Sequence, residues 1–131
     1  MPSIPESHVD LLERPVLAML ATVQPNGQPQ VTPVWADLEN GHVRVNTAAG
    51  RQKWKNMIER PLATITVADP ENPQRYIEVR GRVARHTDEN GDEVIDKLAA
   101  DYLGVESYPN RNPAETRVTF YIEPTRVIAN G

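Results

Sequence analysis

The sequence predicts a mainly β fold, an antiparallel barrel of six strands with short helices that cover its gaps. Two Asn-Gly turns, at 26–27 and 40–41, favour tight hairpins early in the chain. The segments between the turns are short, and they are either dense in apolar residues or alternating, as barrel strands are. At 131 residues the chain is long enough for one core, so we expect a single domain over 1–131.

The first half of the chain predicts one helix and a meander of three strands. A short helix over 6–13 precedes a dense apolar strand over 16–24 and, after the first Asn-Gly turn, an alternating strand over 28–38. The third strand covers 42–47 and follows the second Asn-Gly turn. In this topology we expect it to pair with the strand that carries Pro33.

The second half predicts two more helices and three more strands. The helices cover 51–59 and 88–103, and the strands cover 62–68, 75–86 and 115–129. Gly81 lies inside the long strand, where it predicts a bulge or a close approach of another backbone. Pro124 predicts a bend in the last strand.

The composition excludes several classes of function. The chain has no cysteine, which excludes disulfides, thiolate metal sites and cysteine nucleophiles and fits the reducing cytoplasm where we expect it. A net charge of −4 argues against general nucleic-acid binding. There is no apolar run near the length of a membrane span, and residues 1–8 lack the pattern of a secretory signal.

No catalytic group is evident among the reactive side chains. His8, His42 and His86 lie far apart, which is more typical of solvent-facing or hydrogen-bonded histidines than of metal ligands, and we expect no metal. No serine lies in a nucleophile elbow, and no glycine-rich phosphate loop is present. This pattern suits an enzyme whose cofactor performs the chemistry while the protein binds and orients it.

The helix predicted after Thr47 begins with charges of the wrong sign. A helix start carries partial positive charge, yet its first turns contain Arg51, Lys53 and Lys55. A bound anion would remove this conflict, and Asn46 and Thr47 could add hydrogen-bond donors. The alternative is a solvated basic face. Two of the chain's three lysines fall in this segment, which favours the anion site.

Pro33 interrupts the ladder of a predicted strand. Proline removes a backbone donor, so neighbouring groups could bind the polar edge of a flat heterocycle, and Trp35 points to the same face. The alternative is a plain edge strand in which the proline prevents aggregation. These residues alone leave both interpretations open.

A series of short motifs extends over much of the chain. They are Leu20-Ala21-Thr22, Asn26-Gly27-Gln28-Pro29, Thr32-Pro33-Val34-Trp35, Val45-Asn46-Thr47, Arg51-Gln52-Lys53-Trp54-Lys55-Asn56, Arg60-Pro61 and Val79-Arg80-Gly81. This ordered series resembles the pyridoxamine-phosphate-oxidase-like split-barrel superfamily, and within it the deazaflavin branch, which uses coenzyme F420. The resemblance implies a six- to seven-stranded antiparallel split β-barrel that forms a homodimer, with the cofactor bound across the subunit interface.

The resemblance also implies a set of cofactor-binding positions. They are Thr32, Pro33, Val34, Trp35, Asn46, Thr47, Arg51, Lys53, Tyr76 and Glu78. Arg51 and Lys53 would hold the phosphate, and the backbone of 32–35 would lie along the ring. Tyr76 and Glu78 would approach from the neighbouring subunit, whereas Asn56 would be a structural residue.

The implied activity is that of an oxidoreductase. It would transfer hydride from reduced F420 to an unsaturated small molecule. An FMN-dependent enzyme of the same fold and a non-catalytic flavin-binding protein remain open as alternatives. Residues 129–131 differ from the arginine-rich segment with which pyridoxamine-phosphate oxidases bind substrate, so we do not expect that activity, and nothing here supports haem.

Overall fold

The computed structural model describes all residues, 1–131, as seven antiparallel strands in one sheet and three helices. The strands are β1 (Ala18–Val23), β2 (Pro29–Val34), β3 (Ala36–Glu39), β4 (His42–Ala48), β5 (Leu62–Asp69), β6 (Asn72–Thr87) and β7 (Arg117–Asn130). The helices are α1 (Asp10–Glu13), α2 (Gln52–Glu59) and α3 (Gly91–Leu103). The predicted mainly β fold with six to seven antiparallel strands is therefore confirmed.

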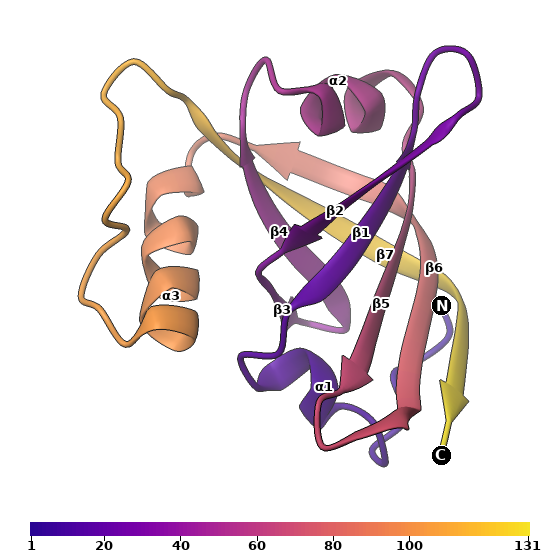
Figure 1. The fold of residues 1–131 in the computed structure, drawn as a ribbon. Helices are drawn as coiled ribbons and strands as arrows, with labels where there is room; N and C mark the ends of the chain where they lie inside the picture. Colours follow the sequence, from indigo (N-terminus) through magenta and orange to yellow (C-terminus); the bar gives the residue numbers. More distant parts are fainter.

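The sheet curls around a core, as Figure 1 shows, in the order β2-β1-β5-β6-β7-β4-β3. Its interior is filled by alternate apolar side chains, because successive residues of a strand point to opposite faces. Val43, Val45, Ile65, Phe120 and Ile122 are fully or almost fully buried there. The core also receives leucines from α1, which lies at the opposite end of the sheet from α2 (Figure 1).

The chain turns a corner at Trp35, where a single continuous strand was expected. The predicted strand over 28–38 is two strands, β2 and β3, because the Ala36 amide donates to the Tyr102 hydroxyl at 3.1 Å. The expected pairing of β4 with the strand that carries Pro33 is also wrong, since β4 pairs with β3 and β7. Both edge strands of the sheet, β2 and β3, therefore meet at Trp35.

Two glycines allow close backbone contacts. A Cβ on Gly81 would lie 2.5 Å from the carbonyl oxygen of Glu123, and the β6–β7 register shifts at this point, as the predicted bulge requires. A Cβ on Gly91 would clash with the carbonyl oxygen of Arg117, so the start of α3 packs directly on β7. Residues 88–90 precede this contact, and α3 begins at Gly91 rather than at the predicted residue 88.

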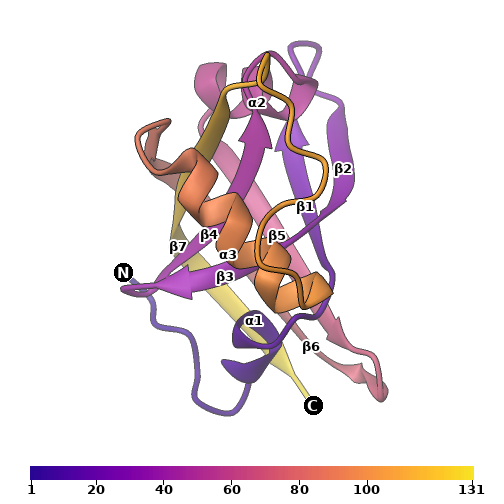
Figure 2. The ribbon, with the colours of Figure 1, turned by 90° about the vertical axis from the view of Figure 1, so that its left-hand side faces the viewer.

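Helix α2 is fixed to the sheet by Asn56, which is fully buried. The Asn56 amide donates to the Thr22 hydroxyl at 3.0 Å, and its oxygen accepts a hydrogen bond from Gln52 at 2.8 Å. At the other end of the chain, the connection 104–116 runs back along α3 toward α2, as Figures 1 and 2 show. The Ala49 amide donates to the carbonyl of Thr116 at 2.8 Å, which joins this connection to the start of α2.

None of the three helices is long and apolar enough to cross a membrane.

Candidate functional site

A cavity of about 310 Å³ lies where the β2–β3 corner, the start of α2, helix α3 and the connection 104–116 meet. Its lining comes from all of these elements. The lining residues are Leu17, Pro33, Val34, Trp35, Asn46, Thr47, Arg51, Lys53, Ile95, Leu98, Tyr108, Asn110 and Arg117.

Most of the residues singled out from the sequence line this one cavity. They are Pro33, Val34, Trp35, Asn46, Thr47, Arg51 and Lys53. Thr32 does not line it, and its buried hydroxyl has no hydrogen-bond partner. Tyr76 and Glu78 lie on β6, away from the cavity of the same chain.

The start of α2 forms the cationic end of the cavity. Arg51 is the N-cap residue, no side chain caps the helix, and its first turn contains no acidic residue. The unpaired N–H groups of this turn therefore keep their partial positive charge. Lys53 is half-buried, and burial together with the charges of Arg51 and Arg117 lowers the pKa of its ammonium group. Lys55, by contrast, is exposed and lines no part of the cavity.

Arg117 adds a third cation that the sequence did not reveal. Only 8% of the residue is exposed, and its Nη1 has no hydrogen-bond partner. Its guanidinium group lies 5.2 Å from the centroid of the Tyr108 ring. Burial lowers the pKa of Arg117 from its ordinary value, and the charge of Arg51 acts in the same direction. The one available signal was an arginine at the start of a buried strand.

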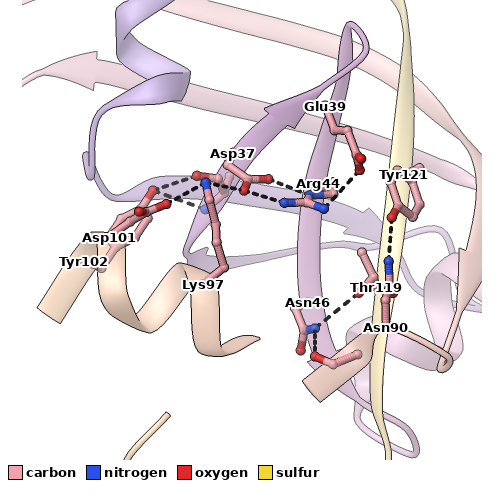
Figure 3. Close-up of polar contacts among 12 residues, drawn as sticks. Asp37, Glu39, Arg44, Asn46, Asn90, Lys97, Asp101, Tyr102, Thr119 and Tyr121 are labelled. Carbon is pink, nitrogen blue, oxygen red and sulfur yellow. Dashed lines mark hydrogen bonds and ion pairs between the residues drawn. The ribbon is translucent and has the colours of Figure 1, made fainter. Parts of the chain in front are cut away.

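Asn46 orients Arg117, because its polar atoms are already bonded within the protein. The Asn46 Oδ1 accepts from the Arg117 Nε at 2.9 Å, while its Nδ2 donates to the carbonyl of Gly91 at 2.8 Å. Figure 3 shows Asn46 reaching from β4 toward the start of α3 and Thr119. Thr47 differs from Asn46, since its buried hydroxyl has no partner.

The end of the cavity at Trp35 is apolar and aromatic. The Trp35 ring stacks on the Tyr102 ring, with centroids 5.5 Å apart, and meets the Tyr108 ring edge-on at 6.1 Å. The Tyr102 hydroxyl donates to the carbonyl of Val16 at 2.9 Å, which fixes α3 to the start of β1. Leu17 lies at this end and is 54% exposed, so the cavity opens to the surface there.

A cluster of paired charges holds α3 in place beside the cavity. Figure 3 shows Asp37 between Arg44 and Lys97, and only 3% of Asp37 is exposed. Both Asp37 oxygens accept from the Arg44 guanidinium group at 2.8 Å, and the Lys97 ammonium group of α3 donates at 2.8 Å. Burial alone would raise the pKa of Asp37, but these hydrogen bonds lower it below the ordinary value.

The outer face of the sheet beside the cavity is apolar and exposed. It includes Leu17, Met19, Val31 and Leu62, which come from β1, β2, β5 and the residue before β1. Met19 pairs with Pro33 on one side and Thr66 on the other, and Thr66 pairs with Glu78. Because these residues are paired across neighbouring strands, Glu78 lies on the same face of the sheet as Met19 and Pro33. Such a contiguous patch is typical of an interaction surface.

A second depression, of about 390 Å³, lies on another side of α2. It is lined by Ala49, Trp54, Ile58, His86, Thr87, Asp88, Glu89, Thr116 and Val118. It contains two carboxylates and neither lysine nor arginine, so its charge does not suit an anion.

Comparison with known proteins agrees with the fold. The family model for pyridoxamine 5'-phosphate oxidase matches residues 4–131. An F420 reductase of known structure is 35% identical to this chain, covers 95% of it and 98% of its own length, and superposes with a TM-score of 0.84.

More distant structures share the fold. The conserved hypothetical protein Rv2991 from Mycobacterium tuberculosis is 21% identical, covers 97% of this chain and 84% of its own, and has a TM-score of 0.75. HupZ from Group A Streptococcus is 23% identical, covers 96% and 93%, and has a TM-score of 0.70. No curated protein matches the sequence. From the family match and the closely superposing reductase it follows that the chain belongs to the pyridoxamine 5'-phosphate oxidase-like split-barrel family.

Proposed function

We propose that this protein is an F420-dependent oxidoreductase that transfers hydride between the bound deazaflavin and an unsaturated small molecule. The observation that carries the proposal is the cavity, which has a cationic end at α2 and an apolar, aromatic end at Trp35. A phosphorylated tricyclic cofactor could bind only if both ends of the cavity lie within the length of the cofactor. The similarity to an F420 reductase supports the choice of deazaflavin.

The cofactor phosphate would bind at the start of α2. Helix N–H groups and cationic side chains together favour a phosphate, because the N–H groups donate hydrogen bonds and the cations supply charge. Lys53 and Arg117 line the cavity there, and the unpartnered Thr47 hydroxyl is a further donor. Arg51 lies at the same end of the cavity, and half of its side chain is exposed.

The ring would lie along β2 and the corner residue Trp35. Strand β2 pairs only with β1, so the backbone groups on its other edge are free to bond the polar edge of a heterocycle. Val34 and Pro33 provide apolar contact for the ring face. When bound, the deazaflavin supplies the hydride chemistry, and the residues of this chain bind and orient it.

A homodimer would complete the site. The exposed apolar face of β1, β2 and β5 adjoins the open end of the cavity through Leu17 and Pro33, and a second copy would cover both. Glu78 shares that face and Tyr76 is on the same strand, so both could reach the cofactor of the partner. Sedimentation should show a dimer at micromolar concentration, whereas a monomer would leave half of the site missing.

The proposal is tested by titrating the protein with F420 and with FMN while cofactor fluorescence is followed. We expect F420 to bind, and Lys53→Ala to weaken binding about ten- to a hundredfold, because a hydrogen bond to a charged group contributes about 1.5–3 kcal/mol. Lys55→Ala is the matched control, since it removes the same charge from the exposed face of the same helix. Equal affinities of both variants and the parent protein would show that α2 faces solvent only.

The two alternatives have distinct outcomes in the same experiments. Tight FMN binding with no F420 binding would assign the cavity to FMN. Cofactor binding without oxidation of reduced F420, across a panel of unsaturated acceptors, would indicate a flavin-binding protein that performs no catalysis.

A further inference from the structure

Glu115 is the one acidic side chain that pairs with the cations of the cavity. Its Oε1 lies 3.5 Å from the Arg51 Nη2, and its Oε2 lies 3.5 Å from the Arg117 Nη1. Each oxygen of one carboxylate thus faces a different arginine. Lys53, the third cation, has no acidic partner among its ion pairs or hydrogen bonds.

Both contacts of Glu115 are long for paired charges. A well-formed hydrogen bond between a guanidinium group and a carboxylate measures about 2.7–2.9 Å. By comparison, the ion pair between Arg44 on β4 and Asp37 on β3 has two hydrogen bonds of 2.8 Å, the length expected of a structural ion pair. The Nη1 of Arg117 makes no hydrogen bond, although it is buried. Glu115 therefore balances the charge of the two arginines through one long hydrogen bond from Arg51, and it leaves the Nη1 of Arg117 without a hydrogen bond.

The backbone holds Glu115 beside the start of α2 whatever its side chain does. The Glu115 amide donates to the carbonyl of Asn112 at 2.9 Å, and the carbonyl of Thr116 accepts from Ala49 at 2.8 Å. Ala49 precedes Arg51 by two residues, so the carboxylate stays within reach of the cationic end. About a quarter of the Glu115 side chain is exposed, which leaves it room to turn toward solvent.

We propose that Glu115 is an internal counter-ion that competes with the anionic group of the ligand for Arg51 and Arg117, and so sets the affinity of the cavity for anions. The inference rests on the proposed function for the position of the phosphate. A phosphate that binds both arginines must displace the carboxylate. Ligands with more negative charge at that point are favoured over ligands with less, because they compete better with Glu115.

The experiment measures binding of inorganic phosphate, FMN and riboflavin by calorimetry to the parent protein, Glu115→Gln and Glu71→Gln. Glutamine keeps the size of the side chain and removes the charge. Glu71 lies in the exposed turn between β5 and β6, at the far end of the sheet from α2, and forms no ion pair, so its variant controls for net charge (Figure 1). Riboflavin has the same ring as FMN and no phosphate.

We expect Glu115→Gln to bind phosphate and FMN about two- to tenfold more tightly than the parent, in line with the loss of two long ion pairs whose carboxylate is partly exposed. Riboflavin should bind both proteins equally, and Glu71→Gln should behave like the parent. Thermal unfolding of each variant checks that the fold is intact.

Two results would overturn the inference in different ways. If phosphate or FMN binds Glu115→Gln no more tightly than the parent, Glu115 orients the arginines or is irrelevant to them, while the proposed cofactor site stands. If neither phosphate nor FMN binds any of the three proteins, the anion site itself is wrong, and the proposed position of the cofactor phosphate fails with it.

Discussion

Two clusters of charge lie beside α3, and they differ in how they are paired. In the cluster around Asp37, each charge meets an opposite charge at hydrogen-bond distance, at 2.8 Å from both Arg44 and Lys97. In the cavity, Arg51 and Arg117 share one carboxylate at 3.5 Å, and Lys53 has no acidic partner. The first arrangement fixes one element on another, whereas the second leaves cationic donors for something else to satisfy.

The pKa directions of the two clusters express the same difference. The pKa of Asp37 is lowered and that of Arg44 is raised, so the protein favours the charged form of both partners. The pKa values of Lys53 and Arg117 are both lowered, chiefly by burial, so the protein disfavours their charged forms. A bound anion would reverse that second effect, since an opposite charge nearby favours the charged form.

The largest expected effect comes from breaking the ion pairs in the cluster around Asp37. Asp37→Asn leaves Arg44 without its main partner in a buried position, and such a change costs about 3–5 kcal/mol in the free energy of unfolding. Urea unfolding at neutral pH measures this. The matched control is Asp101→Asn, which removes an exposed partner of Lys97 and should cost less than about 1 kcal/mol. Equal effects of the two variants would contradict the structural role assigned to Asp37.

Substitution of the cavity cation Arg117 should affect ligand binding more than stability. Arg117→Met is expected to weaken F420 and FMN binding about ten- to a hundredfold, because it removes charged donors from the proposed phosphate site. Its effect on the free energy of unfolding should be smaller than that of Asp37→Asn. The variant leaves the Asn46 oxygen without a donor, but it also removes a buried cation whose Nη1 makes no hydrogen bond. Unchanged affinity together with a large loss of stability would make Arg117 a structural residue.

The smallest expected effect is a dependence of stability on acidic pH, which we expect of the cluster around Asp37 and not of the cavity cations. Because the pKa of Asp37 is lower in the folded protein than in the unfolded chain, its contribution is complete above the unfolded pKa. That contribution is lost as the pH falls through the folded pKa. The stability difference between the parent and Asp37→Asn should therefore narrow in acid. Unfolding curves at neutral pH and at several acidic pH values test this, and a constant difference would argue against it.

The parts of the fold that were predictable depend on local sequence. The Asn-Gly turns specify their hairpins through positive φ, which is 52° at Asn40 and 78° at Gly41 in the second of them. Gly81 marked the bulge in β6, and the charges at 51–53 marked the start of α2. These signals lie within a few residues of the structure that they determine.

The parts that were missed depend on contacts between distant residues. The break at Trp35 arises from Tyr102, which lies 66 residues beyond the amide of Ala36 that it binds. Arg117 reaches the cavity because Gly91 lets α3 pack on the start of β7, and no motif marks it. Asn46 stays a predicted cofactor-binding position, but its contacts with Gly91 and Arg117 could not be foreseen from the local sequence. Each of these features depends on contacts between distant segments of the chain, which no local sequence pattern predicts.

The most direct test of the account is a crystal structure of the protein with F420 bound. We predict that the phosphate lies within hydrogen-bonding distance, about 2.7–3.2 Å, of Lys53 and Arg117, with the ring along Pro33 and Trp35. A cofactor bound in the depression beside Trp54 and His86, or with its phosphate away from the start of α2, would contradict the central claim that the unpaired cations of this cavity form the phosphate site.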